Sequence, residues 1–192
     1  MSILKIAIME INISTKQILK ILYVVSWIIF IGVCIEAGGI IFNAFFSLVL
    51  NPENAQFSWK EVDLSSLLKY DQGYFFVETL LMSIVAVMRA ILFYLIVKII
   101  HDKKINMSQP FTREMGNFIF KVSYLSLGIG MFSYWGVNYT AWLVKSGVNM
   151  PEIQELRLGG ADVWLFMCVT LYVIGHIFKR GIEIQEENDL TV

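Results

Sequence analysis

The chain has 192 residues, of which 57% are hydrophobic and 16% are charged, and its formal net charge is −1. A typical soluble domain has about 45–50% apolar and about 25% charged residues, so this composition excludes an ordinary soluble domain. The near-neutral charge, with no contiguous basic face, argues against direct nucleic-acid binding. The two cysteines, Cys34 and Cys168, fall in apolar blocks and imply no disulfide framework.

Apolar residues gather in four blocks, each as long as the ~20 helical residues that cross a hydrocarbon core of about 30 Å. Segments in lipid must satisfy their own backbone groups, so these blocks are expected to be helices. The predicted fold class is therefore all-α: one polytopic membrane domain (1–192), arranged as a four-helix bundle. The predicted spans cover about 21–46, 74–97, 118–144 and 161–178. The first is expected to stay uncleaved, because its apolar block is too long for a signal peptide.

Three of the segments outside the predicted spans are assigned a place relative to the membrane. An outer loop is expected over 51–73, and its amphipathic stretch VDLSSLLKY predicts one or two helical turns on the outer surface. A cytoplasmic loop is expected over 98–117, with Thr112 as the N-cap of the third span, and a cytoplasmic tail over 179–192. Ten Lys and Arg residues lie on the side of the termini and the 98–117 loop, and four on the other side. This bias predicts that both termini are cytoplasmic.

Four polar residues within the predicted spans are candidates for a ligand-binding or a structural role: Arg89, Glu36, Asn138 and Glu78. The depths are counted from Lys98 and Lys20, taken as the cytoplasmic edges of their spans, with a rise of about 1.5 Å per residue. Arg89 is then expected roughly 13 Å from the cytoplasmic edge, and Glu36 about 10 Å further out. Arg89 is either a structural residue that fixes helix packing or a residue that binds a ligand or gates a path. In the structural interpretation its neighbours would be Ser26, Ser133, Tyr134, Thr170 and Tyr172.

The three other polar residues are expected in the outer half of the membrane. There Glu36, Asn138 and Glu78 would line a polar pocket open to the outside, or a water-filled vestibule that holds no ligand. His101 and His176 lie on different segments without cysteine or carboxylate at ligand spacing, so no metal site is predicted. The sequence has no phosphate-binding glycine loop and no nucleophile elbow. We therefore expect no catalytic residue, no cofactor and no enzymatic activity.

Two stretches carry a resemblance to a known family. They are KIIHDKKINMSQPFTREMGNFIFKVSYL in the cytoplasmic loop and IFKRGIEIQEENDLTV at the C-terminus. Both resemble a YoaS-like bacterial family of four-helix membrane proteins, classed as a domain of unknown function. That family shows an Asn-Pro-Phe-like loop and an Arg-Gly-x-Glu-Leu-Gln-x-Glu-x-Asp-Leu-Thr-Val tail. Gln109 here takes the Asn place and Ile184 the Leu place, and the resemblance runs from about Val62 onward.

The resemblance implies a bacterial cytoplasmic (inner) membrane location and a possible partner. Members are often encoded beside a small helix-turn-helix regulator, so a non-enzymatic regulator or sensor that binds this soluble protein is the leading hypothesis. The alternative for the acidic tail is that it docks on the basic loop of its own chain. The residues expected to bind the partner, or to dock the tail, are Lys103, Lys104, Pro110, Phe111, Arg113, Arg180, Gly181, Glu183, Glu186, Glu187 and Asp189.

Other roles stay open at the level of sequence. The chain could be a small transporter, or an export or immunity component, that works through Arg89, Glu36 and Asn138. It could also be an assembly subunit of a larger membrane complex. Four helices can barely enclose a path for a large solute, so transport would require a homo-oligomer or a partner.

Overall fold

The computed structural model describes residues 15–50, 62–102 and 111–189, and side chains from residue 17 to residue 188 within these ranges. The described chain is helical and contains no strand, as the sequence predicted. Its helices are α1 (Thr15–Val49), α2 (Ser65–Tyr70), α3 (Gln72–His101), α4 (Arg113–Lys145) and α5 (Ala161–Asp189).

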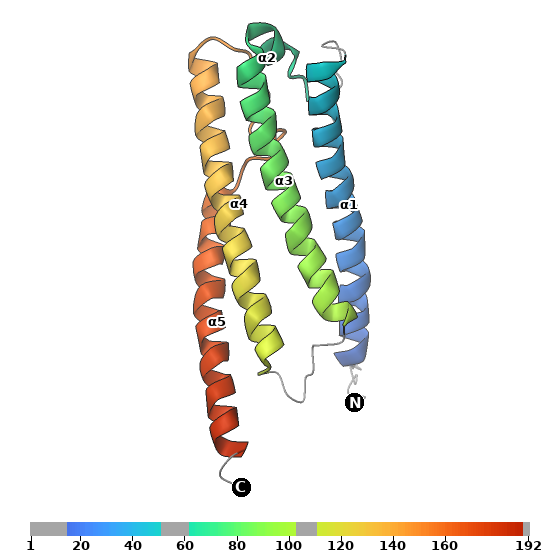
Figure 1. Ribbon diagram of the computed structural model, residues 1–192, viewed down its shortest axis with the longest axis vertical. Coiled ribbons are helices and arrows are strands. Elements are labelled where there is room, and N and C mark those ends of the chain that lie inside the picture. The colour runs from blue at the N-terminus through green and yellow to red at the C-terminus, as the bar shows by residue number, and fades with distance from the viewer. Residues whose placement is uncertain (1–14, 51–61, 103–110, 190–192) are drawn as a thin grey trace, which may run out of the picture.

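The four long helices stand in an open row in the order α1, α3, α4, α5, each antiparallel to its neighbour (Figure 1). In the described part of the chain, α3 is the only long helix whose backbone comes close to that of α1, and α4 is the only one whose backbone comes close to that of α5. The predicted four-helix bundle is therefore not closed. We call the end of the row that carries α2 the α2 end, and the end where α1 begins and α5 ends the terminal end (Figure 1).

The α2 end is closed by the short helix that the sequence predicted there. Leu64, Leu67 and Leu68 of this amphipathic stretch are buried against the helices below. The side chain of Asp71 then accepts a hydrogen bond of 2.9 Å from the backbone N–H of Tyr74 and caps the start of α3. The predicted N-cap at the other end of the row is also confirmed, since the Thr112 hydroxyl accepts a bond of 3.3 Å from the Met115 N–H.

Small residues of α4 allow its two neighbours to approach closely. The hydroxyl of Ser123 donates a hydrogen bond of 2.9 Å to the backbone carbonyl of Cys168 on α5. Gly130 packs directly against Leu165, also on α5. A serine or glycine at such a contact adds no bulk between the backbones, so helices pack as they do in membrane proteins with small interfacial residues. The buried hydroxyl residues of α4 are Ser123, Ser126, Ser133 and Thr140.

Helix α5 is displaced along α4 towards the terminal end. Leu165, in its second turn, lies against Gly130 near the middle of α4, and Ile182 lies against Gly116 near the start of α4. The last turns of α5 therefore extend beyond α4 (Figure 1). Residues 146–160 connect the α2 end of α4 to the start of α5, which lies near the middle of α4. The connecting segment therefore runs back along the helices towards the terminal end.

Three of the described helices are long and apolar enough to cross a membrane: Gln17–Val49, Gln72–His101 and Ala161–Asn188. Helix α4 has 33 residues but does not reach the same apolar content, because its packing faces carry serine, threonine and glycine. The structure thus supports three of the four predicted spans. The fourth span and the orientation stay predictions.

The α4–α5 contact gives a first prediction. We expect Gly130→Ala to lower the free energy of unfolding by about 1–3 kcal/mol, the usual cost of overpacking. The added methyl group would lie 2.8 Å from Leu165 Cγ and 3.2 Å from the Leu165 backbone nitrogen, and a backbone cannot move aside cheaply. Thermal unfolding of the purified protein in detergent measures the loss.

Gly128→Ala is the matched control for this variant. It brings the same gain in helix propensity, but its methyl group would meet the flexible end of the Met88 side chain. Equal unfolding temperatures for the two variants would contradict the close packing of α4 on α5.

Candidate functional site

Arg89 lies near the middle of α3 and is the most deeply placed basic residue of the described chain. Its guanidinium carbon stands 5.7 Å from the centre of the Trp164 ring on α5, within the range of a cation–π interaction. The Nε atom of Arg89 is buried and has no hydrogen-bond partner in the described structure. Trp164 is the fourth residue of α5, and the displacement of α5 along α4 brings it to the middle of the row.

Glu36 of α1 comes level with Arg89. The hydroxyl of Tyr23 bonds Nδ1 of His101 at 2.9 Å, and the rings of Phe30 and Tyr94 lie 6.0 Å apart, which fixes how α1 and α3 are aligned. Glu36 is accordingly close enough to act electrostatically on Arg89. The expected 10 Å difference in depth is wrong. It assumed that Lys20 and Lys98 lie equally deep, whereas the residue opposite Tyr23 is His101.

Arg157 is the third charge of this site, and it comes from the segment 146–160. Its Nε lies 3.5 Å from Oε1 of Glu36, and it also acts electrostatically on Arg89. Leu156 and Leu158 on either side are fully buried, and Leu158 packs against Gly136 of α4. Arg157 itself adopts a left-handed backbone with φ of 58°. Sequence reasoning missed this residue, because no periodicity in 146–160 indicates that the segment returns into the row.

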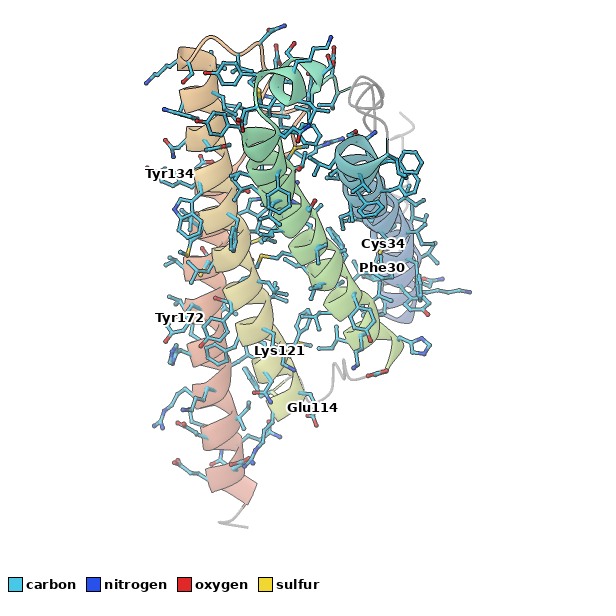
Figure 2. All side chains as sticks on the ribbon, turned by 45° about the horizontal axis from the view of Figure 1, so that its top comes forward. Phe30, Cys34, Glu114, Lys121, Tyr134 and Tyr172 are labelled. Carbon is cyan, nitrogen blue, oxygen red and sulfur yellow. The ribbon has the colours of Figure 1, made fainter. Side chains whose placement is uncertain are left out.

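We call Arg89, Glu36, Arg157 and Trp164 the Arg89 cluster. Three of the five neighbours expected from sequence are not part of it. Tyr134 and Tyr172 are exposed and point away from α3 (Figure 2), and Thr170 is exposed and donates to the Phe166 carbonyl. The expected neighbours were chosen by counting residues from the span edges, and α5 does not begin at the edge.

Glu78 is separated from the Arg89 cluster and forms a site of its own. It precedes Arg89 by eleven residues, or roughly 16 Å along α3. Its side chain is fully buried, Oε1 accepts a hydrogen bond of 2.8 Å from the Thr140 hydroxyl, and Oε2 has no partner in the described structure. Asn138 is exposed and donates its amide to the Tyr134 carbonyl. The expected polar pocket of Glu36, Asn138 and Glu78 is therefore wrong: the three side chains do not converge.

The terminal end brings together four of the expected loop and tail residues. Arg113 contacts Glu186 at 2.7 Å, and the Phe111 ring lies 5.2 Å from the ring of Phe178. A side chain at Gly181 would come within 2.6 Å of Phe111, so glycine is required for this contact. The start of α4 is thus docked on the end of α5. As far as Asp189, the acidic tail continues α5 as a helix, and its residues Gly181 and Glu186 contact the start of α4 and Phe111 just before it.

The other residues expected at this end contribute less to the docked surface. Arg180 pairs with Glu183 three residues later at 3.0 Å, and Glu187 is exposed. The side chain of Asp189 and the residues Lys103, Lys104 and Pro110 lie outside the described part of the chain. Within that part, no three His, Cys, Asp or Glu side chains are grouped so as to hold a metal ion.

The Glu78–Thr140 bond gives a prediction about stability. We expect Thr140→Val to lower the free energy of unfolding by about 1–3 kcal/mol, because it leaves the buried carboxyl group of Glu78 without its donor. The double variant Glu78→Leu/Thr140→Val replaces both polar partners by apolar groups and should recover most of the loss. A thermal unfolding cycle over the wild type, both single variants and the double variant measures the coupling. Additive losses would contradict a direct bond.

One of three comparisons with known proteins found a match. The searches of the curated proteins and of the solved structures each returned no match. A family model with the description "Protein of unknown function (DUF2975)" matches residues 49–192, which covers α2 to α5 and leaves out nearly all of α1. The expected domain of unknown function is confirmed, while the YoaS-like grouping and the tail motif stay predictions. The chain therefore belongs to the DUF2975 family of proteins of unknown function.

Proposed function

We propose that this protein is a non-enzymatic regulator or sensor of the bacterial inner membrane that binds a soluble cytoplasmic partner at its terminal end. In this proposal α1, α3, α4 and α5 all cross the bilayer, and both termini are cytoplasmic. The observation that carries the proposal is a groove between α4 and α5 at the terminal end, next to the docked pair Arg113–Glu186.

A fourth crossing by α4 is supported by its place in the row. It stands between α3 and α5, contacts both, and runs antiparallel to each of them (Figure 1). Its buried hydroxyls face protein and not lipid: Ser123 bonds α5, and Thr140 bonds Glu78 of α3. Low hydropathy is therefore compatible with a span whose polar side is covered by its neighbours.

The orientation is supported by the distribution of charge. Of the Lys and Arg residues whose side chains the structure describes, two lie at the α2 end (Lys69 and Lys145), Arg89 and Arg157 lie between the ends, and six lie towards the terminal end: Lys20, Lys98, Arg113, Lys121, Lys179 and Arg180. Lys98 and His101 lie in the last turn of α3, and Arg113 begins α4, so basic residues flank these helices on the terminal side. Such a bias favours a cytoplasmic location of that end.

The partner site is supported by the shape and charge of the terminal groove, which has a volume of about 350 Å³. Phe120 and Ile182 give it an apolar floor, and its rim carries the basic Arg113 and Lys179 and the acidic Glu183 and Glu186. An apolar centre with a charged rim is the usual anatomy of a protein interface. Because the end of α5 is held by Phe111 and Arg113, it offers a preformed helix. The small helix-turn-helix regulator implied by the family resemblance is the proposed occupant.

The topology can be tested by labelling cysteines from outside the cell. In a background with Cys34 and Cys168 replaced by serine, we expect Glu152→Cys in the segment 146–160 to react with a membrane-impermeant maleimide in intact cells. Glu187→Cys near the end of α5 should react only after the membrane is permeabilised. Reaction of Glu187→Cys in intact cells would instead indicate three crossings, with α4 outside the bilayer.

Partner binding can be tested by crosslinking the full-length protein in native membranes. We expect the wild type to recover a small DNA-binding protein, and Glu183→Lys/Glu187→Lys to reduce the recovery about tenfold, since repulsion replaces attraction at a basic partner surface. Glu152→Lys at the α2 end is the matched charge control and should behave as wild type. A chain that ends at Arg180 should recover none.

Equal recovery by the wild type, the double variant and the chain ending at Arg180 would overturn the proposed partner site. The amount of each variant in the membrane, measured in the same samples, separates a lost contact from a lost protein.

A further inference from the structure

The Arg89 cluster carries more positive than negative charge. It contains two guanidinium groups, Arg89 and Arg157, and one carboxylate, Glu36, and these two partners are the charged groups that act on Arg89. The next carboxylate on α3, Glu78, is bonded to Thr140 near the α2 end. A positive charge without a counter-charge is costly at membrane depth, so the cluster is electrostatically incomplete.

Some hydrogen-bond donors of the Arg89 cluster also lack a partner at normal bonding distance. The Nε of Arg89 is buried and has no partner in the described structure. The contact between Arg157 Nε and Glu36 Oε1 measures 3.5 Å, whereas Arg113 and Glu186 approach to 2.7 Å at the terminal end of the same protein. Charge-assisted bonds normally measure about 2.7–2.9 Å, so Glu36 does not satisfy Arg157 fully. Both guanidinium groups therefore keep donors for a further acceptor.

The cluster can be reached from outside the protein. The side chain of Arg157 is 45% exposed and that of Glu36 is 20% exposed. The open row contributes to this access, because the backbone of α1 does not come close to that of α4 or α5 in the described part of the chain. The Trp164 ring lies against Arg89 and restrains its guanidinium group, so Arg157 is the more exposed and less restrained of the two cations.

From these observations we propose that the Arg89 cluster is a binding site for an oxyanion, a phosphate or carboxylate group. The planar fork of a guanidinium group matches two oxygens of such an anion, and a monatomic ion cannot use that fork in the same way. The anion lies between Arg89 and Arg157 and supplies the missing negative charge. Glu36 competes with it for Arg157. The oxyanion is either free in solution or part of a lipid headgroup.

The test uses the full-length protein purified in an uncharged detergent. Thermal unfolding is followed while inorganic phosphate is titrated in, with sodium chloride adjusted to keep the ionic strength constant. A ligand that binds only the folded state raises the unfolding temperature in a saturable way. We expect such a rise for the wild type and for the control Arg113→Gln, and none for Arg157→Gln.

Glu36→Gln distinguishes a ligand site from a purely structural ion cluster. Without phosphate this variant should unfold at a lower temperature than wild type, because Arg157 has lost its carboxylate. With phosphate it should reach half-saturation at about one tenth of the wild-type concentration, a ratio that corresponds to about 1.4 kcal/mol, since the competing acid is gone. A structural cluster would show the same loss at every phosphate concentration.

A second titration with phosphatidylglycerol in the micelles identifies the source of the oxyanion. Saturable stabilisation by the lipid but not by free phosphate, again lost in Arg157→Gln, assigns the site to a headgroup. Saturation by free phosphate assigns it to a solute. The proposal is overturned if neither probe stabilises the wild type, if Arg157→Gln responds as wild type does, or if Glu36→Gln weakens the response.

Discussion

The close approach of α4 to α5 and to the segment 146–160 is the constraint on which the rest of the structure depends. Gly130 and Gly136 admit Leu165 and Leu158 at distances that no larger residue allows, and Ser123 bonds directly to the α5 backbone. Membrane helices gain little from burying apolar area, so dense packing and interhelical hydrogen bonds hold them together. The same small and polar residues explain why α4, unlike α1, α3 and α5, has no stretch apolar enough to be recognised as a membrane span. Its composition and its central place in the row have one cause.

This packing also decides where charge can lie. Because Gly130 fixes α5 at the middle of α4, the connecting segment must travel back along the row, and it carries Arg157 to Glu36. Trp164 then meets Arg89 for the same reason. Because of the same displacement, the last turns of α5 lie beside the start of α4 at the terminal end. There Phe178 contacts Phe111, and Glu186 pairs with Arg113. Exposed ion pairs contribute only about 0–1 kcal/mol, so the ring contact and Gly181 secure this end more than the Arg113–Glu186 pair does.

Much of the helical framework could be predicted from the sequence, because it follows from local patterns. Long apolar blocks predicted helices α1 and α3, which contain Leu22 and Met82. An amphipathic stretch predicted the short helix α2 with Leu67 and Leu68, and Thr112 predicted the start of α4. The relative heights of residues on different helices could not be predicted. Counting from Lys20 and Lys98 misplaced Glu36 against Arg89, since basic residues at span edges need not lie at one depth. Nor could any local pattern reveal that Arg157 lies inside the row, because the path of 146–160 is set by Leu156 and Leu158 packing on helices formed earlier in the chain.

The dependence of α1 on α3 alone has a consequence for how the molecule is made. Helix α1 leaves the ribosome first, and Arg157 follows Glu36 by 121 residues. A charged side chain at the centre of a lone helix adds about 2.5–3.5 kcal/mol to the cost of insertion. The electrostatic interaction of Glu36 with Arg89 becomes available when α3 is inserted, and the contact with Arg157 forms only later, when the segment before α5 folds back. The charge contacts of α1 are therefore completed by a segment that is synthesised after both α3 and α4.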